Sequence, residues 1–354
     1  MTFENRLTAF VKLGVFLNEQ LCSESAEFTD VLTRANQENS WFTQTNIRFA
    51  LNAVVSDLNE KNLNEWTAHY PFLQHEKLPK TIAVVMAGNL PLVGFRDFLA
   101  VLISGHKLLC KLSSKDHILL KFLTQKLIQI EPKFAELICF EDSIIKGFDA
   151  VIATGGHHAV EHFYDYFSKY PHIIRGHRNS CAILDGTENT DELRGLFEDM
   201  FRYFGLGCRN VTKLFVPKTY DFQPLIEAVR SEKKLFQSLE QHHLYQNNLQ
   251  YQTVVSALNA RHTVDAKVFT LIENTALTPP ISVIHYEYYS SLSEVQHLLE
   301  TQKNQLQCIV SRTDIPFGHA QKPTLLDYAD GVDTMGFLTN LNDQSTLRLR
   351  STTN

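Results

Sequence analysis

The alternation of strand-like and helix-like runs between residues 81 and 156 constrains the fold of this chain more than any other feature of its sequence. Short apolar runs predict strands, and the longer apolar runs between them predict helices. The predicted strands are 81–86, 106–111, 137–140 and 150–154, and the predicted helices are 95–103 and 118–130. This order indicates an α/β protein with an open parallel sheet, whose ligands bind beyond the carboxyl ends of the strands.

The rest of the chain extends this plan. From Phe3 to Trp66, apolar residues recur at helical spacing, which predicts a helical N-terminal layer. After Gly176, strands and helices alternate again as far as Val310, so the second half is also predicted to be α/β. A length of 354 residues favours two domains. We expect a first domain over 1–176, a second over 177–322 and a C-terminal tail over 323–354, whose last dozen polar residues fray.

Composition excludes several classes of function. The formal net charge is -6, and no basic run with interleaved aromatic residues occurs, so nucleic acid is not an expected partner. No run reaches the roughly 18 apolar residues of a membrane span, and the N-terminus lacks the pattern of a signal peptide. The six cysteines show no paired spacing, so we expect free thiols in a cytoplasmic protein, without disulfides.

Polar or small residues follow three of the predicted strands. They are Asn89 after the first strand, Lys111, Ser113 and Ser114 at the end of the second, and Thr154, Gly155 and Gly156 at the end of the strand that covers 150–154. Each group alone resembles an ordinary turn, but together they predict a nucleotide crevice at one edge of the sheet. The chain contains neither the G-x-G-x-x-G fingerprint nor a P-loop, so a standard dinucleotide fold is not indicated.

A rival motif lies just beyond this crevice. His158, Glu161 and His162 fit the H-x-x-E-H pattern of some zinc peptidases, with both imidazoles on one face of a helix. A pattern of three fixed positions arises easily by chance among 15 histidines, and the sequence offers no evident third ligand. A solvated helix end is therefore the preferred interpretation, and we expect no metal.

Cys208 occupies a distinctive place in the second half. A helical run from Thr190 to Phe204 ends near two glycines, Cys208 follows, and an apolar strand runs on to Pro217. The thiol is therefore expected at a turn rather than inside a core. The local pattern leaves two interpretations open, a reactive nucleophile and a buried cysteine that packs near a helix end.

The order and spacing of these landmarks resemble the aldehyde dehydrogenase superfamily. The resemblance spans roughly residues 80 to 320 and is closest to the acyl-CoA reductases, similar to the fatty acid reductase of bacterial luminescence. It rests on Asn89-Leu-Pro91, on Gly105 to Ser114, on Ala153 to Gly156, on Arg175-Gly-His-Arg-Asn and on Gly207-Cys208 with Phe215-Val216 behind it. It implies a Rossmann-like cofactor domain followed by a catalytic domain.

The resemblance also implies a role for each site residue. Cys208 corresponds to the catalytic nucleophile, and Asn89 corresponds to the amide that helps the cysteine N–H hold the oxyanion. Lys111, with Ser113 and Ser114, falls on the part of the site that binds the adenosine ribose. Thr154, Gly155 and Gly156 fall on the turn near the phosphates of the cofactor.

Two departures from the superfamily pattern carry chemical meaning. Ile174 stands where hydrolytic members have a glutamate that activates water, so an acyl-enzyme here would be reduced rather than hydrolysed. Ser114 stands where a glutamate binds the ribose hydroxyls. Loss of that carboxylate removes the repulsion of a 2′-phosphate, which favours NADPH, with NADH as the alternative.

The expected function is the NADPH-dependent reduction of an acyl-CoA, or of an acyl carrier thioester, to an aldehyde through an acyl-cysteine. The alternatives within the fold are an aldehyde dehydrogenase and an acyl-phosphate reductase. Outside this chemistry, the alternatives are a zinc peptidase and a non-catalytic protein that kept the fold. The resemblance further implies a homo-oligomer, because relatives of this fold pair through sheet edges.

Overall fold

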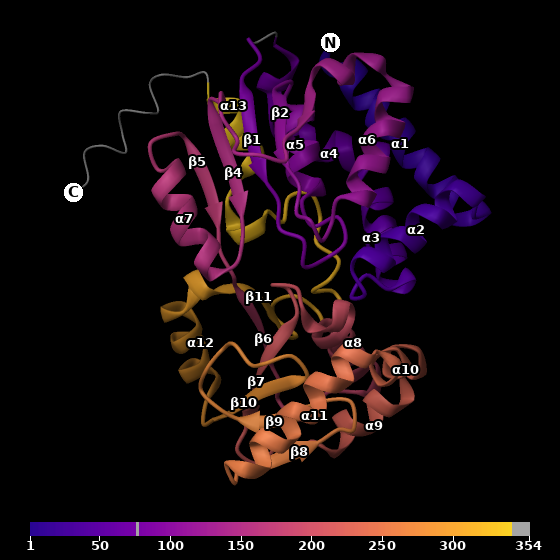
Figure 1. Ribbon diagram of the computed structural model, residues 1–354. Coiled ribbons are helices and arrows are strands. Elements are labelled where there is room, and N and C mark those ends of the chain that lie inside the picture. The colour runs from indigo at the N-terminus through magenta and orange to yellow at the C-terminus, as the bar shows by residue number, and fades with distance from the viewer. Residues whose placement is uncertain (76–77, 342–354) are drawn as a thin grey trace. The chain divides into compact units, whose positions relative to one another are not determined.

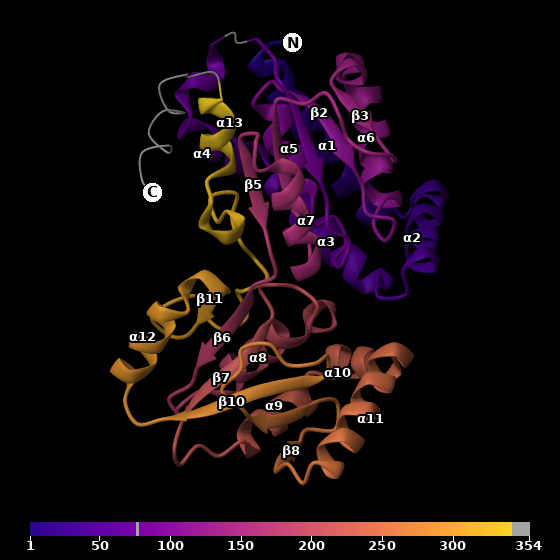
Figure 2. The ribbon, with the colours of Figure 1, turned by 60° about the vertical axis from the view of Figure 1, so that its left-hand side comes forward.

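The computed structural model describes residues 1–75 and 78–341, and Figures 1 and 2 show its elements from two directions. The chain forms two compact units. The first comprises Met1–Gly176 together with the segment that begins at Thr324, and the second comprises His177–Pro323. The chain therefore passes from one unit to the other twice, after Gly176 and after Pro323.

The first unit is built on a parallel sheet with the strand order β3-β2-β1-β4-β5. Its strands are β1 (Thr81–Val85), β2 (Lys107–Lys111), β3 (Ile138–Phe140), β4 (Ala150–Thr154) and β5 (His172–Arg175). The three strands that precede the predicted site loops, β2, β1 and β4, are neighbours in the middle of this sheet. The prediction of an open parallel α/β sheet is confirmed.

Helices cover both faces of this sheet because successive strand residues point to opposite sides. Ile82 and Val84 of β1 pack into a large core with helices α5 (Phe95–Ile103) and α6 (Ile118–Ile130). Ala83 faces the other way, into a smaller core that includes Phe163 of α7 (His157–Phe167). Figure 1 shows α7 beside β4 and β5, with the N-terminal helices on the far side of the sheet.

The predicted helical N-terminal layer is confirmed. It consists of α1 (Phe3–Ser23), α2 (Ala26–Glu38), α3 (Gln44–Asp57) and α4 (Glu60–Ala68). Each begins at a residue whose side chain accepts a backbone N–H, namely Thr2, Ser25, Thr43 and Asn59, and such caps satisfy the free donors of a first helical turn. Their apolar faces join the same core as α5 and α6.

The second unit contains a sheet of order β11-β6-β7-β10-β9-β8, parallel except for β8. Its strands are β6 (Asn179–Ile183), β7 (Val211–Pro217), β8 (Thr263–Asp265), β9 (Thr270–Glu273), β10 (Val283–Tyr289) and β11 (Leu306–Val310). Its helices are α8 (Thr190–Phe201), α9 (Gln223–Ser231), α10 (Lys233–Gln241), α11 (His243–Leu258) and α12 (Leu292–Thr301). Figure 2 shows α12 near β11, at the other side of the unit from α10 and α11.

Three differences from the sequence predictions concern the site or the domain bounds. Helix α8 ends at Phe201 rather than Phe204, because Tyr203 and Phe204 adopt left-handed backbone conformations. Residues 172–175 form the strand β5, which was not predicted. Part of the expected tail is packed, because α13 (Thr334–Asn340) belongs to the first unit and buries Met335 and Leu338. The last dozen residues of the predicted tail lie outside the described residues.

Candidate functional site

The predicted residues of the first unit gather along one edge of its sheet. Because β2, β1 and β4 are parallel neighbours, their carboxyl ends lie at the same edge. The predicted site residues lie at the last positions of these strands and in the loops that follow: Asn89, Lys111, Ser113, Ser114, Thr154, Gly155 and Gly156. The loops after β1 and β2 touch directly, since a Cβ added at Gly88 would lie 2.3 Å from Ser113 Oγ. Only glycine fits there, immediately before the exposed Asn89.

Lys111 ends β2 and reaches the loop after β3. Its Nζ donates to the carbonyl oxygen of Ser143 at 2.8 Å. Hydrogen bonds from Ser143 hold the pKa of the neighbouring Glu141 below its usual range, and the positive charge of Lys111 adds to this effect. Ser113 Oγ accepts the N–H of Lys115 at 3.2 Å, while Ser114 is exposed at the tip of the turn. This part of the edge thus offers a cationic group and an exposed hydroxyl.

The turn after β4 leads directly into helix α7. Gly155 is tightly packed, because a Cβ there would lie 2.8 Å from Phe163 Cε2 and 2.9 Å from Ala159 Cβ. Gly156 is the N-cap of α7, and no side chain among the described residues caps this helix end. As a glycine, Gly156 offers no side-chain acceptor of its own to the N–H groups of the first turn. A helix start of this kind favours phosphate through its N–H groups and its dipole.

Cys208 lies in the second unit, in a turn at the amino end of β7. Gly207 and Asn210 close this turn through a 3.0 Å hydrogen bond from Asn210 N–H to the carbonyl oxygen of Gly207. Cys208 is half-buried, whereas Cys181 and Cys308, the other described cysteines of this unit, are buried. The predicted turn position of Cys208 is confirmed, and the alternative of a core cysteine is wrong.

The backbone just before this turn is strained. Tyr203, Phe204 and Gly205 have φ angles of 57°, 60° and 76°, and a left-handed conformation costs a non-glycine residue roughly 1–2 kcal/mol. Burial of Phe204 offsets part of this cost, since its ring packs against His242 in a tilted arrangement with centroids 4.2 Å apart. Strain of this kind persists where the surroundings fix the backbone, which is common at functional sites.

Asn210 is the residue that fixes the turn, and sequence analysis did not identify it. It is fully buried, and its Oδ1 accepts the N–H of Gly207 at 2.8 Å. Its Nδ2 donates to the carbonyl oxygens of Asp199 at 3.0 Å and Arg202 at 2.9 Å. Asparagine is a frequent turn residue, so the sequence alone gives no signal for this set of contacts.

A second buried side chain, that of Asp199, holds the loop that contains Gly318 and Ala320. Both carboxylate oxygens of Asp199 accept backbone N–H groups, from Gly318 at 2.6 Å and from Ala320 at 2.9 Å. Burial raises the pKa of Asp199 to about 6, although these two hydrogen bonds oppose the rise. Arg209 donates to the carbonyl oxygen of Ala320 at 2.6 Å. The residues around Gly318 are thereby joined to the Cys208 turn.

Ser180 supports the turn from within the sheet. Its Oγ donates to the carbonyl oxygen of Cys208 at 2.9 Å and lies 3.0 Å from Cys308 Sγ. Ser180 is on β6 and Cys308 on its neighbour β11, where the two residues pair in register. The main chain at Cys208 is thus held by a side chain of the central sheet.

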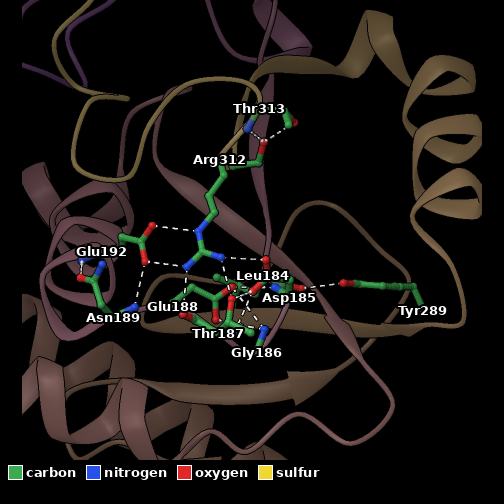
Figure 3. Close-up of polar contacts among 11 residues, drawn as sticks. Leu184, Asp185, Gly186, Thr187, Glu188, Asn189, Glu192, Tyr289, Arg312 and Thr313 are labelled. Atoms are coloured by element: carbon green, nitrogen blue, oxygen red, sulfur yellow. Dashed lines mark hydrogen bonds and ion pairs between the residues drawn. The ribbon is translucent and has the colours of Figure 1, made fainter.

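Arg312 organises the opposite end of this sheet, where β6 and β11 end. Its guanidinium donates to both carboxylate oxygens of Glu192, each at 2.9 Å. It also donates to one carboxylate oxygen of Asp185 at 3.0 Å (Figure 3). It also donates to the hydroxyl of Thr187 at 2.6 Å. Figure 3 shows Tyr289 approaching this loop as well, and its hydroxyl donates to Leu184 at 2.8 Å. These bonds fix the loop that enters α8, the helix that leads to Cys208.

A cavity of about 760 Å³ lies between α12 and β11, next to this cluster. Apolar side chains such as Leu299, Ile309 and Phe317 form part of its wall, and Arg312 and Asp185 contribute polar groups. Cys208 is not among the described residues that line it. The cavity is therefore separate from the surface on which the thiol lies.

The H-x-x-E-H residues lie on α7, and His158, Glu161 and His162 are all exposed. Within residues 1–75 and 78–341, no three histidine, cysteine or carboxylate side chains are grouped so that they could hold one metal ion.

The described part of the chain also contains no helix that is both long and apolar enough to cross a bilayer.

Comparisons with known proteins give a consistent result. The family model described as acyl-CoA reductase (LuxC) matches residues 25–310. No curated protein matches the sequence. Aldehyde dehydrogenase 21 from Physcomitrella patens, solved with the reaction product succinate, superposes with a TM-score of 0.65 at 14% identity, over 94% of this chain and 79% of the other. Aldehyde dehydrogenase C from Pseudomonas syringae, solved with NAD+ and octanal, gives 0.60 at 11% identity, over 88% and 72%. At these identities the structures show a shared fold.

Proposed function

The chain belongs to the acyl-CoA reductase (LuxC) family, and on this premise we propose that it reduces an acyl thioester to an aldehyde with NADPH through an acyl-enzyme on Cys208. The observation that carries the proposal is the state of the cysteines in the second unit. Among the described residues of that unit, Cys208 is the only cysteine that is not buried, and it lies on a turn held by buried side chains. A covalent catalyst needs a nucleophile that is both accessible and fixed.

The residues at the edge of the first sheet fit a nicotinamide dinucleotide. The uncapped start of α7, with open space at Gly156, suits a pyrophosphate, and Thr154 and Gly155 form the turn that leads to it. Lys111, Ser113 and Ser114 would hold the adenosine ribose. Ser114 places no carboxylate at this point, so one source of repulsion toward a 2′-phosphate is missing, which supports NADPH over NADH. When bound, this coenzyme supplies the hydride for the reduction.

The chain's own residues perform the remaining steps. The Cys208 thiolate attacks the acyl carbonyl carbon, a new S–C bond forms, and the bond to the CoA sulfur breaks. CoA leaves as a thiol and takes up the proton that Cys208 has lost. The Asn89 amide and the N–H of Cys208 would donate hydrogen bonds to the oxygen that becomes negative in this step. After hydride delivery, the bond between the substrate carbon and Cys208 Sγ breaks, and its electron pair stays on the sulfur. The aldehyde is released, and Cys208 returns as the thiolate, which takes up a proton from solvent when the thiol forms again.

The acyl-enzyme must survive until it is reduced. Ile174 of β5 supplies no base that could activate water, so hydrolysis of the thioester is slow by comparison. The acyl donor is a CoA or carrier-protein thioester in this proposal, because transfer to Cys208 exchanges one thioester for another.

A two-stage experiment tests the proposal. Mixing the enzyme with a chain-length series of acyl-CoAs, without coenzyme, should release one CoA per active site and leave an acyl adduct on the peptide that contains Cys208. Adding NADPH should then give aldehyde and NADP+ in equal amounts. Cys208→Ala should lose both stages, while Cys22→Ala, which removes an exposed thiol on α1, should keep them.

Three results would contradict the proposal. Aldehyde formation by Cys208→Ala would show that Cys208 is not the nucleophile. Labelling of Cys208 by acyl phosphates but not by acyl-CoAs would identify an acyl-phosphate reductase. No CoA burst with any acyl-CoA, together with no turnover, would favour a non-catalytic protein with this fold.

A further inference from the structure

The loop that carries Asn89 is fixed on both sides by one other loop, residues 113–116. On the N-terminal side, the backbone of Gly88 packs so closely on Ser113 that a Cβ at position 88 would lie 2.6 Å from Ser113 Cβ. On the C-terminal side, the N–H of Leu92 donates to Asp116 Oδ2 at 2.7 Å. Asn89 lies between these two fixed points. Its position therefore depends on the loop after β2 as much as on β1.

Leu92 needs such a support. Its φ angle is 59°, in the left-handed region that favours glycine, and its side chain is buried. An unsupported leucine would leave this conformation, because it costs roughly 1–2 kcal/mol. A hydrogen bond from its N–H to a carboxylate is stronger than one to a neutral acceptor. The carboxylate of Asp116 thus holds the turn between Asn89 and α5 in a strained form.

Asp116 does little else in the described structure. It is 8% exposed, its Oδ1 has no hydrogen-bond partner, and no ion pair to it occurs among residues 1–75 and 78–341. Burial raises its pKa to about 7, even though backbone N–H groups of Leu92 and Val93 oppose the rise. A buried carboxylate without a cation lowers stability. The hydrogen bonds that its carboxylate accepts come from Leu92 and Val93, in the turn that follows Asn89.

We propose that Asp116 is a positioning residue that holds the Asn89 amide where it can donate to the oxyanion. This inference rests on the proposed function, because it assumes that Asn89 stabilises the oxyanion. Asp116 acts through the backbone of Leu92 and touches no reacting atom. In this proposal, the loop 113–116 has two roles: Ser113 and Ser114 bind the ribose of the cofactor, and Asp116 positions the oxyanion donor Asn89.

A double-mutant cycle tests this role, with the rate of the CoA burst as the readout. Asn89→Ala should slow the burst by roughly 100- to 1,000-fold, the usual effect of losing one oxyanion donor. Asp116→Ala should slow it about 10- to 100-fold with little change in KM. The double variant should be no slower than Asn89→Ala, because Asp116 has nothing left to position. A purely structural role would instead multiply the two effects.

Two further variants keep the test decisive. Asp149→Ala is the matched control, since its carboxylate accepts the N–H of Thr81 at 2.7 Å, at the other end of β1, and the burst should be unchanged. Asp116→Asn keeps the side-chain volume and one acceptor oxygen, so it should restore part of the rate and serves if Asp116→Ala does not fold. An Asp116→Ala burst equal to that of Asp149→Ala, or effects that multiply, would overturn the proposal. If Asn89→Ala releases CoA at the wild-type burst rate, Asn89 does not stabilise the oxyanion, and the role proposed for Asp116 is then also wrong.

Discussion

The Asn210 amide donates a 2.9 Å hydrogen bond to the carbonyl oxygen of Arg202, and this contact joins the Cys208 turn to the end of α8. It bridges the strained residues Tyr203 and Phe204, which lie between the two. The same side chain accepts the N–H of Gly207. The sulfur therefore lies on a backbone that is bound to the helix before it and, through Ser180, to the strand β6.

Asn210→Ala should loosen this turn. The substitution removes three hydrogen bonds, to the carbonyl oxygens of Asp199 and Arg202 and from the N–H of Gly207. Each lost bond costs about 1 kcal/mol, so we expect the unfolding free energy to fall by about 2–4 kcal/mol. The CoA burst should slow as well. Urea unfolding and burst kinetics measure the two effects. Asn259→Ala is the control, since it removes one exposed side-chain bond on α11 and should change neither. A wild-type burst rate in Asn210→Ala would contradict the role given to Asn210.

Asp97→Asn should destabilise the first unit. Arg175 Nη1 lies 2.9 and 2.7 Å from the two carboxylate oxygens of Asp97, and Nη2 donates to Thr334 of α13 at 2.6 Å. The pair is mostly buried, and removal of one partner from a buried pair costs about 3–5 kcal/mol, because the other charge stays behind. Lys303→Gln removes one partner of the exposed pair with Glu300 and should show no measurable loss. Equal unfolding midpoints for the two variants would disprove this assignment.

Stability should depend on pH through two buried aspartates. Burial raises the pKa of Asp116 to about 7 and that of Asp199 to about 6, from 3.8. A carboxyl whose pKa is higher in the folded state binds its proton more tightly there. Its contribution is complete below pH 3.8 and is lost as the pH rises through the folded pKa, by at most about 1.4 kcal/mol per pH unit. Glu38, Lys115 and His117 line the recess beside Asp116, and Glu198 and His319 face Asp199.

Asp116→Asn tests this prediction, because asparagine does not titrate. Between pH 5 and pH 8 the variant should lose less unfolding free energy than the wild type, as measured by urea unfolding at each pH. The Asp149→Ala variant should follow the wild type. Parallel curves for Asp116→Asn and the wild type would show that Asp116 does not carry the raised pKa.

Substitution by alanine should have different effects at the two adjacent glycines before α7, Gly155 and Gly156. Gly155→Ala forces a Cβ to 2.8 Å from the Phe163 ring, and overpacking of this kind costs about 1–3 kcal/mol. Helix α7 would shift, so NADPH should also bind more weakly. Gly156→Ala meets no atom within 4 Å and has a φ of −71°, so its thermal midpoint should stay at the wild-type value. Thermal unfolding and the NADPH fluorescence titration provide the measurements, and a normal midpoint in Gly155→Ala would contradict the packing argument.

Much of the fold followed from local patterns. Helices 95–103 and 118–130 and the strand 150–154 occur with the predicted bounds, because apolar residues dominate each of these runs. The short strand β5 was missed because His172 and Arg175 interrupt its apolar character, although Arg175 is buried by its pair with Asp97. Helix α8 was predicted too long, since apolar spacing does not reveal a left-handed backbone at Tyr203.

The sequence by itself determined which segments become strands and helices, and which residues follow the strand ends, because both depend on neighbours within a few positions. It therefore identified Asn89, Gly156 and Cys208 as candidates. Only the tertiary structure decided what holds them. Asp116 supports Leu92 from 24 positions away, and Asp199 binds Gly318 from 119 positions away. Such contacts depend on burial and on the close approach of distant loops, which no local pattern encodes.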